Sequence, residues 1–208
     1  MFDAHIRRLI DPPLDVLGKR LAYLGVPANS VTLAGFAIGL AAVPLIASEH
    51  YLLALVFIAV NRVMDGLDGA VARNRRLTDF GGYLDIVCDF IFYSAVVFGF
   101  ALARPEENAV AAAFLILSFM GTGSSFLAYA IIAAKRGEGA ARKSSKSFVY
   151  LGGLTEGTET IVFLAAFALF PDWFVPLALV FAVLAWVTTV SRIMMTWQAF
   201  GRPDEPGG

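Results

Sequence analysis

The sequence contains few charged residues, a single cysteine and only two histidines. Charged residues make up 16% of the 208 residues, and hydrophobic residues make up 58%, which is outside the usual composition of a soluble domain. The lone Cys88 excludes a disulfide within the chain. No histidine or cysteine lies at a metal-ligand spacing, and we expect no nucleic-acid partner. The composition therefore predicts a polytopic membrane protein.

The first 26 residues form an amphipathic segment that contains no apolar run long enough to cross a bilayer. Leucine and isoleucine alternate with Arg7, Arg8, Lys19 and Arg20, and Pro12-Pro13 interrupts the pattern. We expect residues 1–26 to lie in the membrane interface, or to pack as a helix on the rest of the protein. The segment has neither the apolar stretch nor the cleavage site of a signal peptide, so none is expected.

Six apolar segments follow, each long enough to cross a hydrocarbon layer of about 30 Å. They cover residues 31–48, 51–73, 80–103, 109–134, 148–170 and 173–199. We therefore predict an all-α integral membrane domain of six transmembrane helices over residues 27–200, with a disordered tail over residues 201–208. In the first segment, Gly35-x3-Gly39 predicts a face at which helices pack closely.

Positive charge is distributed unevenly between the two ends of these segments. Of the 16 Lys and Arg residues, all but Arg62 and Arg104 belong to one end, and Arg62 lies inside the second segment. The positive-inside rule then places both termini and this basic end in the cytoplasm. The expected location is a bacterial-type inner or plasma membrane.

Four aspartates lie at the basic end of the second and third segments. Asp65 and Asp68 are three residues apart, and Asp85 and Asp89 are four apart, so each pair shares one face of a helix. A carboxylate at membrane depth is costly unless it is paired or bound to a cation. Four hard oxygen donors favour Mg²⁺, with two ions expected and Mn²⁺ possible. The alternative is that the aspartates only cap helices in the headgroup region.

The same stretch carries further residues at fixed spacings. The pattern is Asp65-x2-Asp68-Gly69-x2-Ala72-Arg73, followed by Gly81-x3-Asp85-x3-Asp89. It resembles the signature of the CDP-alcohol phosphotransferases, with one departure: seven rather than eight residues separate Arg73 from Gly81. The resemblance implies a membrane enzyme of phospholipid synthesis. Such an enzyme breaks the diphosphate of a CDP-alcohol, releases CMP and joins the substituted phosphate to a second alcohol.

The resemblance also implies roles for individual residues. The implied metal ligands are Asp65, Asp68, Asp85 and Asp89, and Asp89 also resembles the general base that acts on the incoming hydroxyl. The implied nucleotide-binding residues are Gly69, Ala72, Arg73, Thr78, Asn29 and Thr32. Members of the family are expected to form homodimers.

The acceptor alcohol is less clear from the sequence. A basic loop follows the fourth segment, and Arg192 lies inside the sixth, where an arginine usually has a partner or a ligand. We interpret these cations as binding a phosphorylated acceptor such as glycerol phosphate or inositol phosphate. The candidate acceptor residues are Lys135, Arg142, Arg192 and Glu156. Alternatively, the loop sets topology and binds anionic headgroups.

Two other functions are compatible with the same aspartates. One is transfer from a soluble CDP-aminoalcohol to diacylglycerol, although this short chain more resembles the bacterial enzymes that use CDP-diacylglycerol. The other is a small divalent-cation carrier, which requires polar residues continuing across the membrane. Residues 52–60 and 91–103 are nearly all apolar, so the sequence favours the enzyme.

Overall fold

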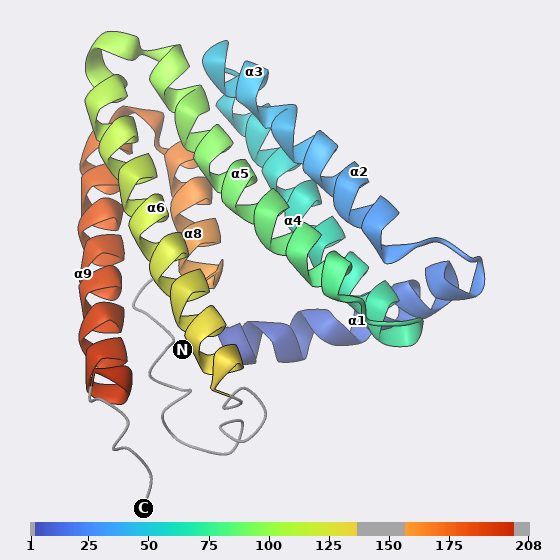
Figure 1. The fold of residues 1–208 in the computed structure, drawn as a ribbon. Helices are drawn as coiled ribbons and strands as arrows, with labels where there is room; N and C mark the ends of the chain where they lie inside the picture. The colour runs from blue at the N-terminus through green and yellow to red at the C-terminus, as the bar shows by residue number, and fades with distance from the viewer. Residues whose placement is uncertain (1–2, 137–156, 202–208) are drawn as a thin grey trace, which may run out of the picture.

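A computed structural model describes residues 3–136 and 157–201 of the chain, and all regular structure in these two ranges is helical (Figure 1). The prediction of an all-α fold is confirmed for this part of the protein. The helices are α1 (Asp3–Tyr23), α2 (Ala28–Leu40), α3 (Ala42–Ala47), α4 (Tyr51–Asn74), α5 (Asp79–Ala103), α6 (Pro105–Lys135), α8 (Gly157–Leu169) and α9 (Phe174–Phe200), with a 3₁₀ turn at Pro171–Trp173.

Four helical stretches are long and apolar enough to cross a membrane: Ala28–Ala47, Asp79–Ala103, Pro105–Lys135 and Pro171–Phe200. The first consists of α2 and α3 in sequence. Helix α4 has sufficient length but includes Arg62, Asp65 and Asp68. Helix α8 has 13 residues, and the start of its predicted span, residues 148–156, lies outside the described ranges. The protein is thus a membrane protein, whereas six spans and an interfacial α1 stay predictions.

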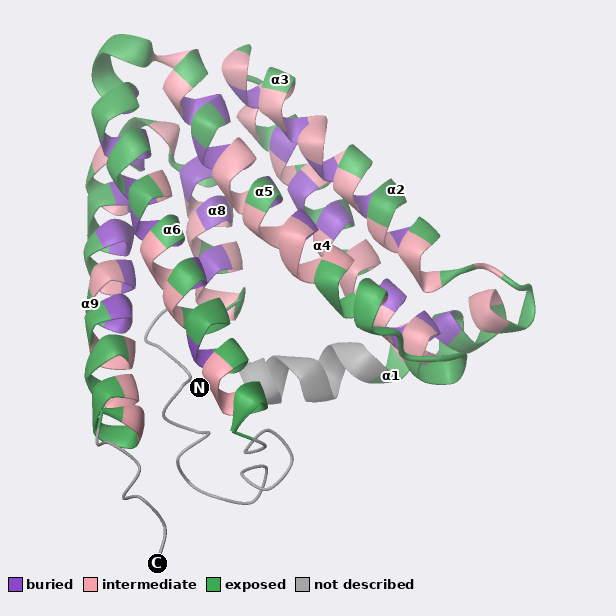
Figure 2. Cartoon of the chain, viewed as in Figure 1, coloured by how far each residue is buried: buried purple, intermediate pink, exposed green. Residues whose placement is uncertain are grey.

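The hydrophobic core combines aliphatic side chains with a group of phenylalanines, part of which lies at the end of the helices away from α1. Phe100 of α5 stacks on Phe174 of α9 with 4.7 Å between ring centroids, and Phe167 of α8 meets both rings edge-on. All three side chains are completely buried. The outer faces of the helices are largely exposed (Figure 2). Many of the exposed side chains are apolar, such as Val110 at 82% exposed. Apolar side chains on both the inside and the outside are expected for helices surrounded by lipid.

Helix α2 approaches α4 and α5 closely at Gly39. A Cβ atom at this position would lie 2.8 Å from Asn61 Nδ2 of α4 and 2.8 Å from Phe92 Cε2 of α5. Gly35, one turn earlier, comes equally close to Met64 of α4. The predicted close-packing face of the first segment is therefore present, and it brings α2 against the half of α4 that carries the aspartates.

Arg104 joins three connections at the end opposite α1. Its guanidinium donates to Asp172 at 2.7 Å and to Glu49 at 3.3 Å, linking the α5–α6, α8–α9 and α3–α4 connections. The hydrogen bonds to Asp172 and Glu49 raise the pKa of Arg104 above its ordinary value. These contacts hold together helix ends that are distant in sequence.

Replacing Arg104 with glutamine is expected to lower the melting temperature by a few degrees only, because exposed ion pairs contribute little. The difference from wild type should shrink as salt is added, since salt screens exposed charges. Thermal unfolding in detergent at low and high salt measures both effects. A difference that does not change with salt would show that charge is not the cause.

Candidate active site

A short turn between α4 and α5 places the aspartates of the two helices next to one another. Thr78 begins α5 as its N-cap, and its Oγ1 accepts a hydrogen bond from the Gly81 amide at 3.0 Å. Side-chain oxygens at this position satisfy an amide that has no partner within the helix. The cap fixes the first turn of α5 and thereby the register in which Asp85 faces α4.

Asp65, Asp68 and Asp85 form the carboxylate cluster of this site. One oxygen from each lies within 4.8 Å of the others. Asp68 is 6% exposed, and its Oδ2 has no hydrogen-bond partner among the residues that the structure describes. An unpaired buried carboxylate oxygen is costly, and a cation among three oxygens of this kind removes that cost. The donor set fits a hard divalent ion such as Mg²⁺.

Asp89, the fourth predicted ligand, is held by other groups. Its Oδ1 accepts a hydrogen bond from Arg62 Nη2 at 2.8 Å, and its Oδ2 accepts one from the Tyr93 hydroxyl at 3.1 Å. It nevertheless lines the same small cavity as Asp65 and Asp68. The structure thus brings three of the four aspartates together and places the fourth beside them, bound to an arginine.

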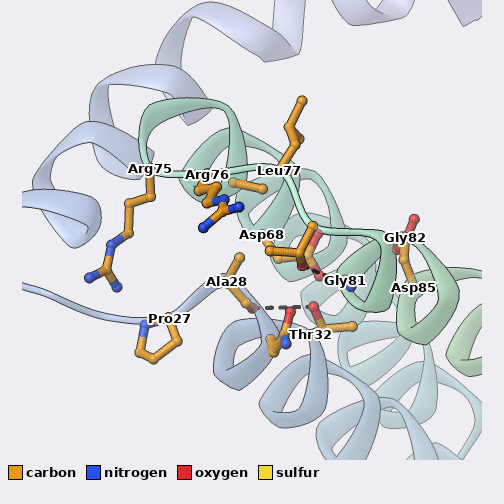
Figure 3. Close-up of a pocket in the computed structure, with 14 residues that line it drawn as sticks. Pro27, Ala28, Thr32, Asp68, Arg75, Arg76, Leu77, Gly81, Gly82 and Asp85 are labelled. Carbon is orange, nitrogen blue, oxygen red and sulfur yellow. Dashed lines mark hydrogen bonds between the residues drawn. The ribbon is translucent and has the colours of Figure 1, made fainter.

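A cavity of about 400 Å³ opens beside the cluster, on the side of α2 (Figure 3). Figure 3 shows Arg75 and Arg76 of the α4–α5 turn at one side of it, and Asp68, Asp85 and Gly81 at the other. A Cβ at Gly81 would come within 3.0 Å of Thr78 Oγ1, so glycine keeps this wall open. Five of the six predicted nucleotide-binding residues line the cavity: Asn29, Thr32, Gly69, Ala72 and Thr78.

Arg73, the sixth predicted nucleotide-binding residue, contacts α1. Its Nη2 lies 2.8 Å from Asp15 Oδ1, and it is not among the residues that line the cavity. Helix α1 packs tightly here, because a Cβ at Gly18 would lie 2.6 Å from Ala70 Cβ. In place of Arg73, the cations that border the cavity are Arg75 and Arg76.

A second cavity, of about 330 Å³, lies on the opposite side of α5 between α6, α8 and α9. Asp85 lines both of these cavities, and Asp89 lines the second. Aromatic side chains such as Phe90 and Phe126 make up much of the wall, and Arg192 of α9 borders the space. Arg192 Nη1 donates to the Thr122 carbonyl of α6 at 2.9 Å. The carboxylates therefore lie between a cavity bordered by Arg75, Arg76 and several uncharged polar side chains and a cavity with aromatic walls that Arg192 borders.

Of the other predicted acceptor residues, only Lys135 lies in the described ranges, as the last residue of α6. Arg142 and Glu156 lie outside them. The sequence did not place Arg62, Asn61 or Tyr93 in the site. In the structure Arg62 and Tyr93 donate to Asp89, and Asn61 accepts from Arg62. An arginine within a predicted span indicates that a partner is present, but the identity of that partner depends on which helices pack together.

Comparison with known proteins agrees with this geometry. A model of the family described as CDP-alcohol phosphatidyltransferase matches residues 26–195. The chain belongs to this family. It is a membrane transferase of substituted phosphate groups, in a family of phospholipid-synthesis enzymes. The recognition of the family from the aspartate pattern is confirmed.

Individual relatives cover nearly the whole chain. The inner membrane protein YnjF of Escherichia coli K12 is 51% identical over 193 residues, which are 93% of this chain and 94% of that protein. An archaetidylinositol phosphate synthase of Pyrococcus horikoshii is 32% identical and aligns over 90% of this chain and 93% of its own length.

One solved structure has a similar fold. It is the Mycobacterium tuberculosis phosphatidylinositol phosphate synthase PgsA1 with CDP-DAG bound, at a TM-score of 0.68 and 22% identity. The similarity covers 92% of this chain and 98% of that one. At this identity the likeness shows a shared fold and no more.

Proposed function

We propose that this protein transfers a phosphatidyl group from CDP-diacylglycerol to a phosphorylated alcohol and releases CMP. The observation that carries the proposal is that Asp85 lines two cavities of different chemistry, with the other aspartates beside it. A cavity bordered by two arginines and polar side chains suits a nucleotide diphosphate, and a cavity with aromatic walls and Arg192 suits the second reactant next to lipid. The CDP-DAG named for the PgsA1 structure supports the donor.

The donor's cytidine diphosphate fits the cavity beside α2. Arg75 and Arg76 border it and offer positive charge to a diphosphate, and Gly69 and Gly81 leave room for it close to the backbone. We place this cavity at the cytoplasmic face, because nearly all Lys and Arg residues belong to this end of the chain.

Asp65, Asp68 and Asp85 would hold Mg²⁺, and Asp89 is the further ligand for a second ion. When bound, the metal supplies positive charge that offsets the negative charge developing on the diphosphate. The Oδ2 atom of Asp68, which has no hydrogen-bond partner among the described residues, is the feature that supports this assignment. The homodimer implied by the family resemblance stays a prediction.

Asp89 is the proposed general base, since it lines the second cavity, where the acceptor would lie. The acceptor oxygen forms a bond to the phosphorus that carries diacylglycerol, and its proton passes to Asp89. The bond from that phosphorus to the oxygen shared with the cytidine phosphate breaks, and CMP leaves with that oxygen. Hydrogen bonds from Arg62 and Tyr93 orient the carboxylate.

Arg192 is the described cation best placed to bind the acceptor's phosphate. It borders the second cavity, where it lies over the Phe126 ring and bonds to α6. A guanidinium binds phosphate through a fork of donors. The archaeal relatives are archaetidylinositol phosphate synthases, which makes inositol 1-phosphate the first acceptor to test, ahead of glycerol 3-phosphate.

The test is CMP release by purified protein with CDP-diacylglycerol, Mg²⁺ and one acceptor at a time. We expect release with inositol 1-phosphate and none with free inositol, which lacks the phosphate. Release from a soluble CDP-aminoalcohol with diacylglycerol, and not from CDP-diacylglycerol, would reverse donor and acceptor. No release with either donor would contradict the proposal and favour the cation carrier, despite the aromatic core between the helices.

Replacing Arg192 with glutamine should raise KM for the phosphorylated acceptor by roughly 10- to 100-fold, the value of a hydrogen bond to a charged group. KM for CDP-diacylglycerol should be unchanged. Steady-state kinetics with each substrate varied in turn separates the two constants. Arg20→Gln, which removes an exposed arginine of α1, is the control. Equal changes in both constants would argue against an acceptor site.

A further inference from the structure

Arg62 lies inside the site although the aspartate pattern does not include it. It comes one turn before Asp65 on α4, and its side chain is only 10% exposed. Its Nη2 lies 2.8 Å from Asp89 Oδ1, and its Nη1 lies 3.6 Å from Asp65 Oδ2. A cation therefore stands between the metal-binding cluster and the fourth aspartate.

The surroundings of Arg62 hold it in this position. Asn61 Oδ1 accepts from both Nε and Nη2, at 2.8 and 2.6 Å, and Asn61 itself donates to the Gly35 carbonyl of α2 at 2.9 Å. Nη1 donates to the Tyr93 hydroxyl at 2.8 Å. The rings of Phe92 and Tyr93 flank the guanidinium, with centroids 4.8 and 5.1 Å from Cζ. A buried guanidinium with this many partners is fixed by three helices.

The charge balance of the site follows from this geometry. Asp89 is neutralised by Arg62, whereas Asp65, Asp68 and Asp85 converge within 4.8 Å. Asp89 and Asp65 line one small cavity together with Arg62, so Asp89 is near the cluster but bonded away from it. A second divalent ion would have to compete with the guanidinium for Asp89.

We propose that Arg62 is a positioning residue that serves as the resident counter-ion of Asp89. It holds this carboxylate away from the three-aspartate cluster, so that the protein without substrate binds one divalent cation instead of two. The second ion binds when the donor's diphosphate adds negative charge to the site. This part of the inference rests on the proposed function. Arg62 thus ties completion of the metal site to arrival of the nucleotide.

The experiment is a titration of purified protein with Mn²⁺, followed by electron paramagnetic resonance, without nucleotide or lipid donor. Wild type is expected to bind one ion per chain. Arg62→Gln should bind a second ion at least tenfold more tightly than wild type does, on the order expected for removing a unit charge a few ångströms away. Arg62→Lys, which keeps the charge, should bind as wild type does. A loss of structure does not create a second metal site.

A double variant tests whether the effect passes through Asp89. If it does, Asp89→Asn and Asp89→Asn/Arg62→Gln bind the same number of Mn²⁺ ions. Their affinities for Mn²⁺ then differ only by the general effect of removing one positive charge. Arg62→Met fills the same space between the aromatic rings without charge, and it takes the place of Arg62→Gln should that variant not fold. Arg104→Gln loses the same charge at the far end of the helices and should leave Mn²⁺ binding unchanged.

Two results would overturn the proposal. One is Mn²⁺ binding by Arg62→Gln, or by Arg62→Met, that matches wild type in number and affinity. The other is a second ion that appears in the double variant lacking Asp89. Because the titration contains no donor or acceptor, its outcome is independent of the transferase assay, and each proposal can fail while the other holds.

Discussion

Replacing Asp68 with asparagine is expected to reduce CMP release at least about a thousandfold. The reason is that a bound metal contributes several kcal/mol to phosphoryl transfer, and about 4 kcal/mol corresponds to a thousandfold in rate. Asp68 is the most buried member of the cluster, and its Oδ2 has no partner among the described residues other than the proposed cation. An amide of the same shape keeps the packing and removes the charge.

The affinity for Mn²⁺ and the rate of CMP release should both decrease in Asp68→Asn. The matched control is Asp79→Asn, which removes an equal charge from the exposed first turn of α5, a few residues from the cluster. That variant should retain both metal binding and activity. If Asp68→Asn kept its affinity for Mn²⁺, or if Asp79→Asn lost activity to the same extent, the cluster would not be the metal site.

Replacing Asp89 with asparagine is expected to lower kcat by about a thousandfold, within the range that a general base contributes. Unlike Asp68→Asn, this variant should still bind one Mn²⁺ per chain without substrate, because the three-aspartate cluster remains. KM for the acceptor should change little, since Asp89 acts on the hydroxyl and Arg192 on the phosphate. Asp68→Asn is thus expected to lose both metal binding and activity, whereas Asp89→Asn is expected to lose activity and keep the first metal ion.

Steady-state kinetics and Mn²⁺ titration on one preparation of Asp89→Asn check this separation. Size-exclusion chromatography shows whether loss of the Arg62 partner has disturbed the fold. A variant that turns over within tenfold of wild type would contradict a base at this position. A variant that loses its first Mn²⁺ would make Asp89 a ligand of the primary ion.

The convergence of Asp65, Asp68 and Asp85 could be predicted from the sequence because the information for it is local. Spacings of three and four residues fix which side chains share a helix face, and a short turn fixes that the two helices are neighbours. Thr78, Asn29 and Thr32 followed from the family resemblance, and all three line the cavity beside Asp68. The family resemblance therefore added Asn29 and Thr32 of α2, which the spacing of the aspartates alone does not indicate.

The contacts of Arg73 and Arg62 were not predictable, because they depend on segments distant in sequence. Arg73 was expected to bind the nucleotide, but Asp15 of α1 lies 2.8 Å from it, and no periodicity indicates that α1 packs at this point. Arg62 depends on Asn61, which is oriented by the Gly35 carbonyl, and on Tyr93 of α5. Such partners are set by helix packing. The apolar pattern predicts which face of a helix is buried, but not which residues of other helices lie against it.

The division of α4 into an apolar and a charged half has a similar origin. Composition alone leaves it out of the helices that qualify as membrane spans, although it is long enough. Arg62 of α4 is paired with Asp89 and Tyr93 of α5, and its neighbour Asn61 donates to the Gly35 carbonyl of α2. A charged helix becomes acceptable in a membrane protein through its neighbours.

The most direct test of the account is to measure CMP and lipid product in one reaction. Purified protein is given CDP-diacylglycerol, Mg²⁺ and inositol 1-phosphate, and mass spectrometry quantifies CMP and the new phosphodiester lipid, with Asp68→Asn beside it. Wild type is expected to form equal amounts of the two products, and the variant is expected to form neither. CMP without a new lipid would indicate hydrolysis, and equal products from Asp68→Asn would contradict a reaction at the carboxylate cluster.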